Sequence, residues 1–151
     1  MPMPTDDMVT AIFKKLDAST LLQGATYLNG TDKIEKQARR RKGMMAPCIT
    51  MKIGGTSLNT ESKVMDATVY INTYVADHAN GTANYAKLSS IAVTVEALLE
   101  DADLSSYSMY RFFNCYVVSP HGEAYLDPDF PDEHYVTTVI RYQCQGDLGV
   151  A

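Results

Sequence analysis

The strongest constraint on the fold of this chain is a long alternation of apolar and polar side chains between residues 63 and 75. Successive residues of a β-strand point to opposite faces of a sheet, so the alternation predicts one face on a core and the other toward water or a partner. The apolar set is Met65, Ala67, Val69, Ile71 and Val75, and the polar set is Asp66, Thr68, Tyr70, Asn72 and Tyr74. About twelve strand residues reach ~40 Å, roughly twice the usual length. We therefore expect this strand to curve strongly or to project beyond the body of the domain.

Three further segments have the composition of strands. Residues 46–53 alternate after a proline, and Gly54-Gly55 indicates a hairpin turn behind them. Residues 107–118 carry aromatic residues and valines on both faces, which is typical of a central strand. Residues 134–145 alternate again and predict the last strand.

Two segments have apolar residues at helical spacing. The first covers residues 5–16, with Thr5 as the expected N-cap and acidic residues in the first turn, where the helix dipole favours them. The second covers residues 84–100; its β-branched stretch 91–95 also suits a strand, but the total length favours a helix. The apolar positions of the second helix are Tyr85, Leu88, Ile91, Ala92, Val95, Leu98 and Leu99, and we expect Leu98 to lie in the core.

The order helix, strand, strand, helix, strand, strand predicts an α+β fold. Each strand pair is joined by a short connection and is therefore antiparallel. We expect two layers, a mostly antiparallel sheet with the two main helices packed on one face. The 151 residues suit a single domain, with a structured core over about residues 5–145 and a frayed tail at 146–151.

Composition excludes several classes of protein. Thirteen basic and eighteen acidic side chains give a net charge of −5, which argues against general nucleic-acid binding. The N-terminus lacks a signal-peptide pattern and no apolar run is long enough to cross a bilayer, so we expect a soluble chain made in the cytoplasm. The three cysteines, Cys48, Cys115 and Cys144, are far apart and are expected to be buried thiols.

Two segments outside the expected helices and strands carry clusters of charged residues. Residues 33–43 form a basic arm or loop containing the run Arg39, Arg40, Arg41 and Lys42. Residues 119–132 form a long, acidic, proline-rich loop. Each could be no more than a solvated surface. The basic run could also dock on DNA or on an acidic neighbouring subunit. Opposite charges far apart in one chain suit head-to-tail association, which can close into a ring.

No constellation of residues predicts catalysis or metal binding. The histidines His78, His121 and His134 lack the local spacing of zinc ligands, and prolines interrupt the acidic loop where a calcium site needs its ligands. Cys115 and His134 could pair if their strands were neighbours, but a buried strand cysteine is the simpler interpretation. Gly54-Gly55-Thr-Ser lacks the lysine and the helix of a phosphate loop. We therefore assign no catalytic, cofactor-binding or metal-binding residue.

The candidate functional residues are interface residues. Tyr70 and Tyr74 share the polar face of the long strand, where they could pack across strands or contact a partner. The full set of interface candidates is Arg39, Arg40, Arg41, Lys42, Tyr70, Tyr74, Asp127, Asp129 and Asp132.

The order and rhythm of these segments resemble a known family. An amphipathic helix precedes the proline-led strand Ala46-Pro-Cys-Ile-Thr-Met, a long strand, and a helix with the rhythm Tyr85-Ala-Lys-Leu-Ser-Ser-Ile-Ala-Val-Thr-Val-Glu-Ala-Leu-Leu. Two strands separated by an acidic loop end in Tyr135-Val-Thr-Thr-Val-Ile-Arg-Tyr. Over about residues 5–145 this resembles the tail completion, or tail terminator, proteins of long-tailed bacteriophages. The segments 33–43 and 119–132 depart from that pattern.

The resemblance implies a structural virion protein without catalysis or cofactor. Such a subunit forms a homo-oligomeric ring, commonly a hexamer, that caps the tail tube and meets the head–tail connector or neck proteins. It implies assembly in the host cytoplasm, a final place in the virion tail or neck, and no contact with a membrane or with specific nucleic-acid sequences. Two alternatives remain: a connector or stopper protein of the neck, and a small cytoplasmic α+β enzyme or ligand-binding domain.

Overall fold

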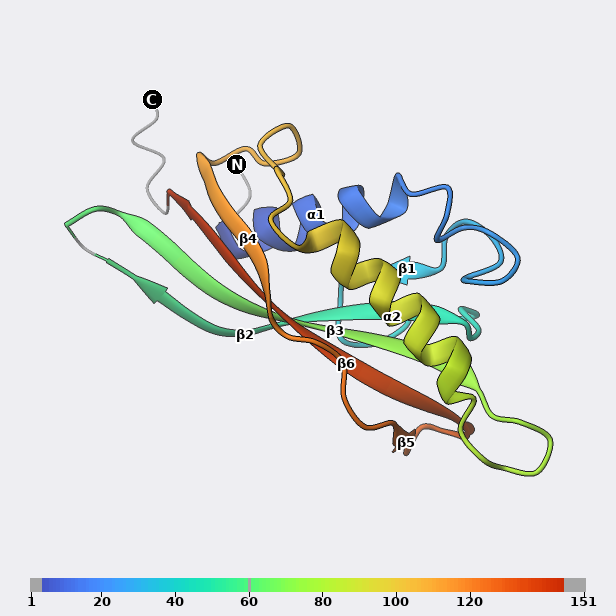
Figure 1. The fold of residues 1–151 in the computed structure, drawn as a ribbon. Helices are drawn as coiled ribbons and strands as arrows, with labels where there is room; N and C mark the ends of the chain where they lie inside the picture. Colours follow the sequence, from blue (N-terminus) through green and yellow to red (C-terminus); the bar gives the residue numbers. More distant parts are fainter. Residues whose placement is uncertain (1–3, 60, 146–151) are drawn as a thin grey trace.

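A six-stranded sheet carries both helices on one of its faces (Figure 1). The computed structural model describes residues 4–59 and 61–145, so the expected frayed tail lies outside the described residues. The elements are α1 (Pro4–Asp17), β1 (Ile34–Glu35), β2 (Cys48–Leu58), β3 (Val64–Ala76), α2 (Tyr85–Leu99), β4 (Phe112–Ser119), β5 (Tyr125–Asp127) and β6 (Phe130–Gln145). The predicted two-layer α+β fold is confirmed. Within these residues, neither helix has the length and apolar character that a membrane span requires.

The two longest strands form the centre of the sheet. The strand order is β1-β2-β3-β6-β4, with β5 paired to β6, and every pairing is antiparallel except that of β1 with β2. All of β3 pairs with β6, from Val64 opposite Gln145 to Ala76 opposite Glu133. The long alternation in the sequence therefore belongs to a strand that is paired on both sides.

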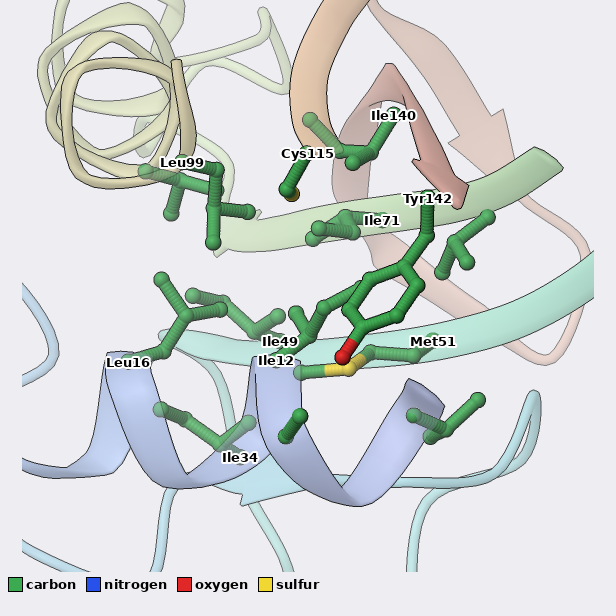
Figure 2. Close-up of a cluster of buried hydrophobic side chains, with 14 of the residues drawn as sticks. Ile12, Leu16, Ile34, Ile49, Met51, Ile71, Leu99, Cys115, Ile140 and Tyr142 are labelled. Atoms are coloured by element: carbon green, nitrogen blue, oxygen red, sulfur yellow. The ribbon is translucent and has the colours of Figure 1, made fainter. Parts of the chain in front are cut away.

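The core lies between the sheet and the helices. Buried side chains from both layers meet there, and Figure 2 shows the Tyr142 ring pointing from β6 into the space above α1. The buried side chains that Figure 2 labels are Ile12, Leu16, Ile34, Ile49, Met51, Ile71, Leu99, Cys115, Ile140 and Tyr142. Burial of one such Ile or Leu contributes about 1.5–3 kcal/mol, so this cluster is the main source of stability.

Both helices form where the sequence predicts them, with small corrections. Helix α1 begins at Pro4, a residue suited to the first turn, so Thr5 lies inside the helix and is not its N-cap. Asn84 caps α2, accepting a hydrogen bond from the Lys87 N–H at 3.2 Å. Of the two leucines at the end of α2, Leu99 is fully buried, whereas Leu98 is only half-buried.

The predicted turn at Gly54-Gly55 is wrong. Both glycines continue β2, and the register with β3 shifts between Ile53 and Thr56, which marks a bulge. A Cβ atom on Gly54 would lie 2.2 Å from Cε2 of Tyr70, so the ring of Tyr70 can lie across the strand only because this residue is glycine. The chain reverses later, where the Lys63 N–H bonds the Asn59 carbonyl at 2.7 Å.

Two strand assignments near the C-terminal half need correction. Strand β4 begins at Phe112 and lies at the edge of the sheet, so residues 107–118 do not form a central strand. Residues 119–132 are not a single loop, because β5 forms within them and β6 already begins at Phe130. The apolar residues of β4 therefore do not reflect a position in the middle of the sheet.

The β2–β3 hairpin reaches beyond the helical layer, as Figure 1 shows. Its outer part in β2, residues 54–58, is exposed. The expectation that the long strand curves or projects is thereby met.

Candidate interaction surfaces

The basic segment lies on the helix-free face of the sheet and is anchored there. Met44 packs against Cys48 and Tyr74, on the face opposite the core. The guanidinium carbon of Arg40 lies 4.5 Å from the centre of the Tyr74 ring and 3.7 Å from that of Phe130. Arg40 is therefore held between two aromatic rings rather than extended into solvent.

Two acidic residues neutralise Arg40. It donates hydrogen bonds to Glu133, and its Nη2 atom lies 3.6 Å from Oδ2 of Asp127. Only 5% of the Arg40 side chain is exposed. Burial alone would lower the pKa of Arg40, but the hydrogen bond to Glu133 and the nearby acids outweigh it and raise the pKa. A buried charge is tolerated only with such partners, so Arg40 fastens the segment to the sheet.

The other basic residues of the segment remain at the surface. Arg39, Arg41 and Lys42 are exposed, although Arg41 also donates to the Asp32 carbonyl at 2.6 Å and lies 3.7 Å from Glu35. A groove of about 410 Å³ runs between this segment and Phe130, with Asp129 at its border. Met45 in the groove is 71% exposed. We call Arg39, Arg41, Lys42 and Met45 the basic patch.

The structure divides the predicted interface residues into two groups. Arg40, Tyr74 and Asp127 are brought together inside the protein, where Asp127 also accepts a hydrogen bond from the Asp129 N–H at 2.9 Å. The exposed members are Arg39, Arg41, Lys42, Tyr70, Asp129 and Asp132. Contact between these exposed residues and a partner stays a prediction.

The rest of the helix-free face carries a network of polar side chains. Asp66 binds Arg141 and accepts a hydrogen bond from Gln143 at 3.2 Å, while Thr137 donates to Asn72 at 2.6 Å. The hydrogen bond with Arg141 holds the pKa of Asp66 below its usual range, and the same contact raises the pKa of Arg141. Cross-strand pairs of this kind fix the side chains of a solvent-facing surface without burying them.

The side chains of Ser89, His121 and Glu96 are linked in space as the serine, histidine and acid of a hydrolase triad are. The Ser89 Oγ lies 3.0 Å from His121 Nε2, and His121 Nδ1 lies 2.9 Å from Glu96 Oε2. The same carboxylate oxygen accepts hydrogen bonds from the His121 N–H and the Thr138 hydroxyl. Because a carboxylate only accepts, Nδ1 of His121 is the donor to Glu96, and in the neutral imidazole Nε2 then accepts a hydrogen bond from Ser89.

The surroundings of Ser89 favour a structural role for these three residues. Ser89 lies in the interior of α2, where backbone N–H groups are bonded within the helix and cannot stabilise an oxyanion. The hydrogen bonds of His121 instead fasten the segment after β4 onto α2 and the sheet. Sequence reasoning missed this cluster, because His121 lies 25 positions after Glu96, in the segment that follows β4.

The cysteines and the remaining histidines are kept apart. Cys115 lies opposite Tyr142 in β6, whereas His134 lies near the other end of that strand, 2.5 Å from Asp77. Cys115 and His134 therefore do not pair, and Cys115 is a buried strand cysteine as expected. Burial raises the pKa of the thiols, to about 11 for Cys48 and Cys144 and about 12 for Cys115. In the part of the chain that the structure describes, no three His, Cys, Asp or Glu side chains gather to hold a metal ion.

Sequence reasoning also missed an acidic surface at the end of α2. Asp101 and Asp103 are exposed and, with Phe113 of β4, line a groove of about 450 Å³. We call these three residues the acidic corner. The hydrogen bonds from Ser105 lower the pKa of Asp103, so it is charged at neutral pH. The run Glu-Asp-Ala-Asp after the helix was the signal available in the sequence.

Comparisons with known proteins bear on the fold. No protein-family model matches the chain, and no curated protein matches it. Among solved structures, the fold is similar to that of a chain described as "Virion of native gene transfer agent (GTA) particle". The TM-score is 0.68 at 16% identity, and the likeness covers 91% of this chain and 94% of that chain. At this identity the likeness establishes a shared fold.

Proposed function

We propose that this chain is a virion structural protein of the tail terminator, or tail completion, type. It forms a ring that caps the tail tube and joins it to the head–neck connector. The observation that carries the proposal is the fold likeness to a chain of a gene transfer agent virion, because it spans nearly the whole of both chains. The resemblance of the element order to phage tail terminators supports the same function from the sequence.

The use of the polar side chains favours assembly over catalysis. Arg40 with Glu133, Asp66 with Arg141, and His121 with Glu96 each join elements of the fold to one another. The surfaces left over are the outer hairpin, the two edges of the sheet and the basic patch. Surfaces of this kind contact other proteins.

The mechanism is geometric. A closed ring on the end of the tail tube stops further addition of tube subunits, and its opposite surface receives the neck. The exposed residues Arg39, Lys42 and Tyr70 are candidates for these contacts with tube or neck proteins. Arg40, buried beneath the patch, holds its neighbours in place.

The proposal is tested first on the purified chain and then with its partners. Native mass spectrometry and negative-stain microscopy should detect closed rings. Added to polymerising tail tube protein of the same virion, the rings should sit at tube ends and halt growth; a strict monomer at high concentration contradicts the proposal. Rings that bind neck proteins but leave tube growth unchanged favour the alternative, a connector or stopper of the neck.

A further inference from the structure

The basic patch combines an exposed apolar side chain with positive charge. Met45 is 71% exposed, and Arg39 and Lys42, which line the same groove, are exposed as well. Asp129 at the border of the groove offsets part of this charge. Methionine and arginine are both enriched where proteins contact one another, and a large exposed apolar side chain within a charged rim is typical of such a contact.

The residue beneath the patch holds it in one arrangement. Only 5% of the Arg40 side chain is exposed, because it lies between the rings of Tyr74 and Phe130. Its ion pair with Glu133 fastens the segment to the start of β6. A surface that is fixed before its partner arrives loses less conformational entropy on binding. The patch is therefore suited to a specific partner.

At the other end of the sheet, the acidic corner has a groove of complementary character. This groove has a volume of about 450 Å³; Asp101 and Asp103 border it, and the rings of Phe112 and Phe113 line it. Glu100, the preceding residue in the chain, adds negative charge. A methionine side chain is flexible and makes favourable contacts with aromatic rings, so a groove of this kind can receive one.

Neighbouring groups limit how the acidic corner can be used. Arg111 and Lys15 lie near it and reduce its negative charge without cancelling it. The Glu100 carboxylate accepts a hydrogen bond from the Val117 N–H at 2.8 Å, on the outer side of β4. A contact at this corner therefore uses the side chains of the turn and the groove, and not the backbone groups at the edge of the strand.

The two surfaces lie too far apart to meet within one copy. Phe130, in the groove of the basic patch, is the first residue of β6, whereas Phe112, in the groove of the acidic corner, pairs with Cys144 near the end of that strand. The separation along the strand is roughly 45 Å at ~3.3 Å per residue. A contact between the two surfaces can therefore join only different copies, head to tail, and such contacts can close into a ring.

We propose that the basic patch of one copy binds the acidic corner of the next copy. Met45 enters the groove beside Phe113, and the cations of the patch face the acids of the corner. The inference rests on the proposed ring and names the surfaces that build it; Tyr70 then remains for contacts with tube or neck proteins. The acidic pole is the turn after α2 and not the 119–132 segment, because Asp127 lies beside the basic segment of its own chain.

Charge reversal on the two sides tests this contact. The variant R39E/K42E and the variant D101N/D103K should each lose rings when purified alone, because each brings like charges together. Asparagine is chosen at position 101 because Asp101 has a φ of 52°, which asparagine tolerates. Mixed in equal amounts, the two variants should form rings again, alternating around the ring, because every contact then joins opposite charges. Native mass spectrometry measures assembly.

Matched variants separate this contact from a general effect of charge or of apolar surface. The control K36E/K52E reverses two other exposed lysines and should keep its rings. Met45→Ala should raise the concentration needed for half-assembly by at least about tenfold. Leu21→Ala, at another exposed apolar residue, should leave that concentration unchanged. Thermal unfolding checks that each variant is folded.

A second measurement uses the unmodified chain. A zero-length carbodiimide should link Lys42 to Asp101 or Asp103, and mixtures of light and heavy-isotope chains should show that these links join different copies. The distance between the two surfaces excludes the same link within one copy.

The outcomes separate this contact from the proposed function. Wild-type rings overturn the contact, and leave the ring standing, if they lack these links, if the variants assemble as well as K36E/K52E, or if the mixture does not recover. Rings that persist in R39E/K42E but no longer bind tube protein or DNA assign the patch to that partner and also overturn the contact.

Three further results are informative. Links between isotope-labelled copies support the contact even if one variant fails to fold. Open filaments that carry these links support the contact and overturn the ring. A wild-type chain that stays monomeric overturns both.

Discussion

Arg40 donates hydrogen bonds to Glu133, a residue 93 positions later in the chain, from between the rings of Tyr74 and Phe130. This contact joins the basic segment to the start of β6 and to β3. A residue that the sequence presents as one of four surface cations is thereby part of the fold.

Replacing Arg40 should therefore destabilise the protein far more than replacing its neighbour. Arg40→Ala leaves Glu133 and Asp127 without their buried partner and should lower the free energy of unfolding by about 3–5 kcal/mol. Arg39→Ala, at an exposed position, should change it by less than about 0.5 kcal/mol. Urea unfolding of both variants measures the difference, and equal midpoints would contradict the buried placement of Arg40.

Gly54 and Gly55 offer a matched pair of substitutions. Gly54→Ala should destabilise the hairpin by about 1–3 kcal/mol, because the new methyl group meets the Tyr70 ring. Gly55→Ala meets no atom within 4 Å and should be much milder. The double variant Gly54→Ala with Tyr70→Ala should recover most of the loss in thermal unfolding, since the obstructing ring is gone.

The two leucines at the end of α2 distinguish the phase of the helix. Leu99→Ala should cost about 2–5 kcal/mol, since Leu99 is fully buried in the core. Leu98→Ala should cost clearly less, because Leu98 is partly exposed. Denaturant midpoints compare the two, and a larger loss for Leu98 would reverse the assignment.

Stability should fall at alkaline pH because of the buried thiols. Their pKa values, about 11 for Cys48 and about 12 for Cys115, lie above the ordinary value of 9.0, so below pH 9 both folded and unfolded chains keep the protons. Above pH 9 the unfolded chain loses them first, which favours unfolding until the folded thiols ionise near pH 11–12. Cys115→Ala should reduce the slope of unfolding free energy against pH between 9 and 11; an unchanged slope would contradict this origin.

Ser89 should not react as a nucleophile. The helix interior gives it no oxyanion donors, so a fluorophosphonate probe should leave Ser89 unlabelled in intact protein, as judged by mass spectrometry of its peptide. His121→Ala should lower the melting temperature, because it removes the hydrogen bonds of the ring to Glu96 and Ser89. Labelling that disappears in His121→Ala would revive the enzyme alternative.

The sequence predicts the elements that depend on local periodicity. The alternation in β3 and the helical spacing in α2 each reflect one face packed against one core, and both elements form close to the expected residues. The predicted turn at Gly54-Gly55 is wrong because glycine occurs both in tight turns and where a neighbouring group comes close to the backbone. Here Gly54 leaves space for the Tyr70 ring across the strand. Strand β4 has the composition of a central strand but lies at the edge of the sheet, because composition does not determine the position of a strand within a sheet.

The candidate surfaces were harder to predict, for a physical reason. Whether Arg40 is solvated or buried depends on Tyr74, Phe130 and Glu133, which only the tertiary fold brings to it. The acidic corner is visible as a short run of charge, but its meaning depends on Phe113 beside it. The local sequence pattern indicates neither the burial of Arg40 nor the position of Phe113 beside the acidic residues.

The place of β6 in the sheet also bears on when the protein can begin to associate. Strand β4 has no partner within the sheet until residues 130–145 are available, since β6 separates it from β3. A chain still under synthesis on the ribosome therefore displays neither a finished edge nor a stable sheet until this stretch has left the exit tunnel. Under the proposed ring assembly, nascent chains on one messenger RNA would therefore not join prematurely, because the sheet is complete only in finished subunits.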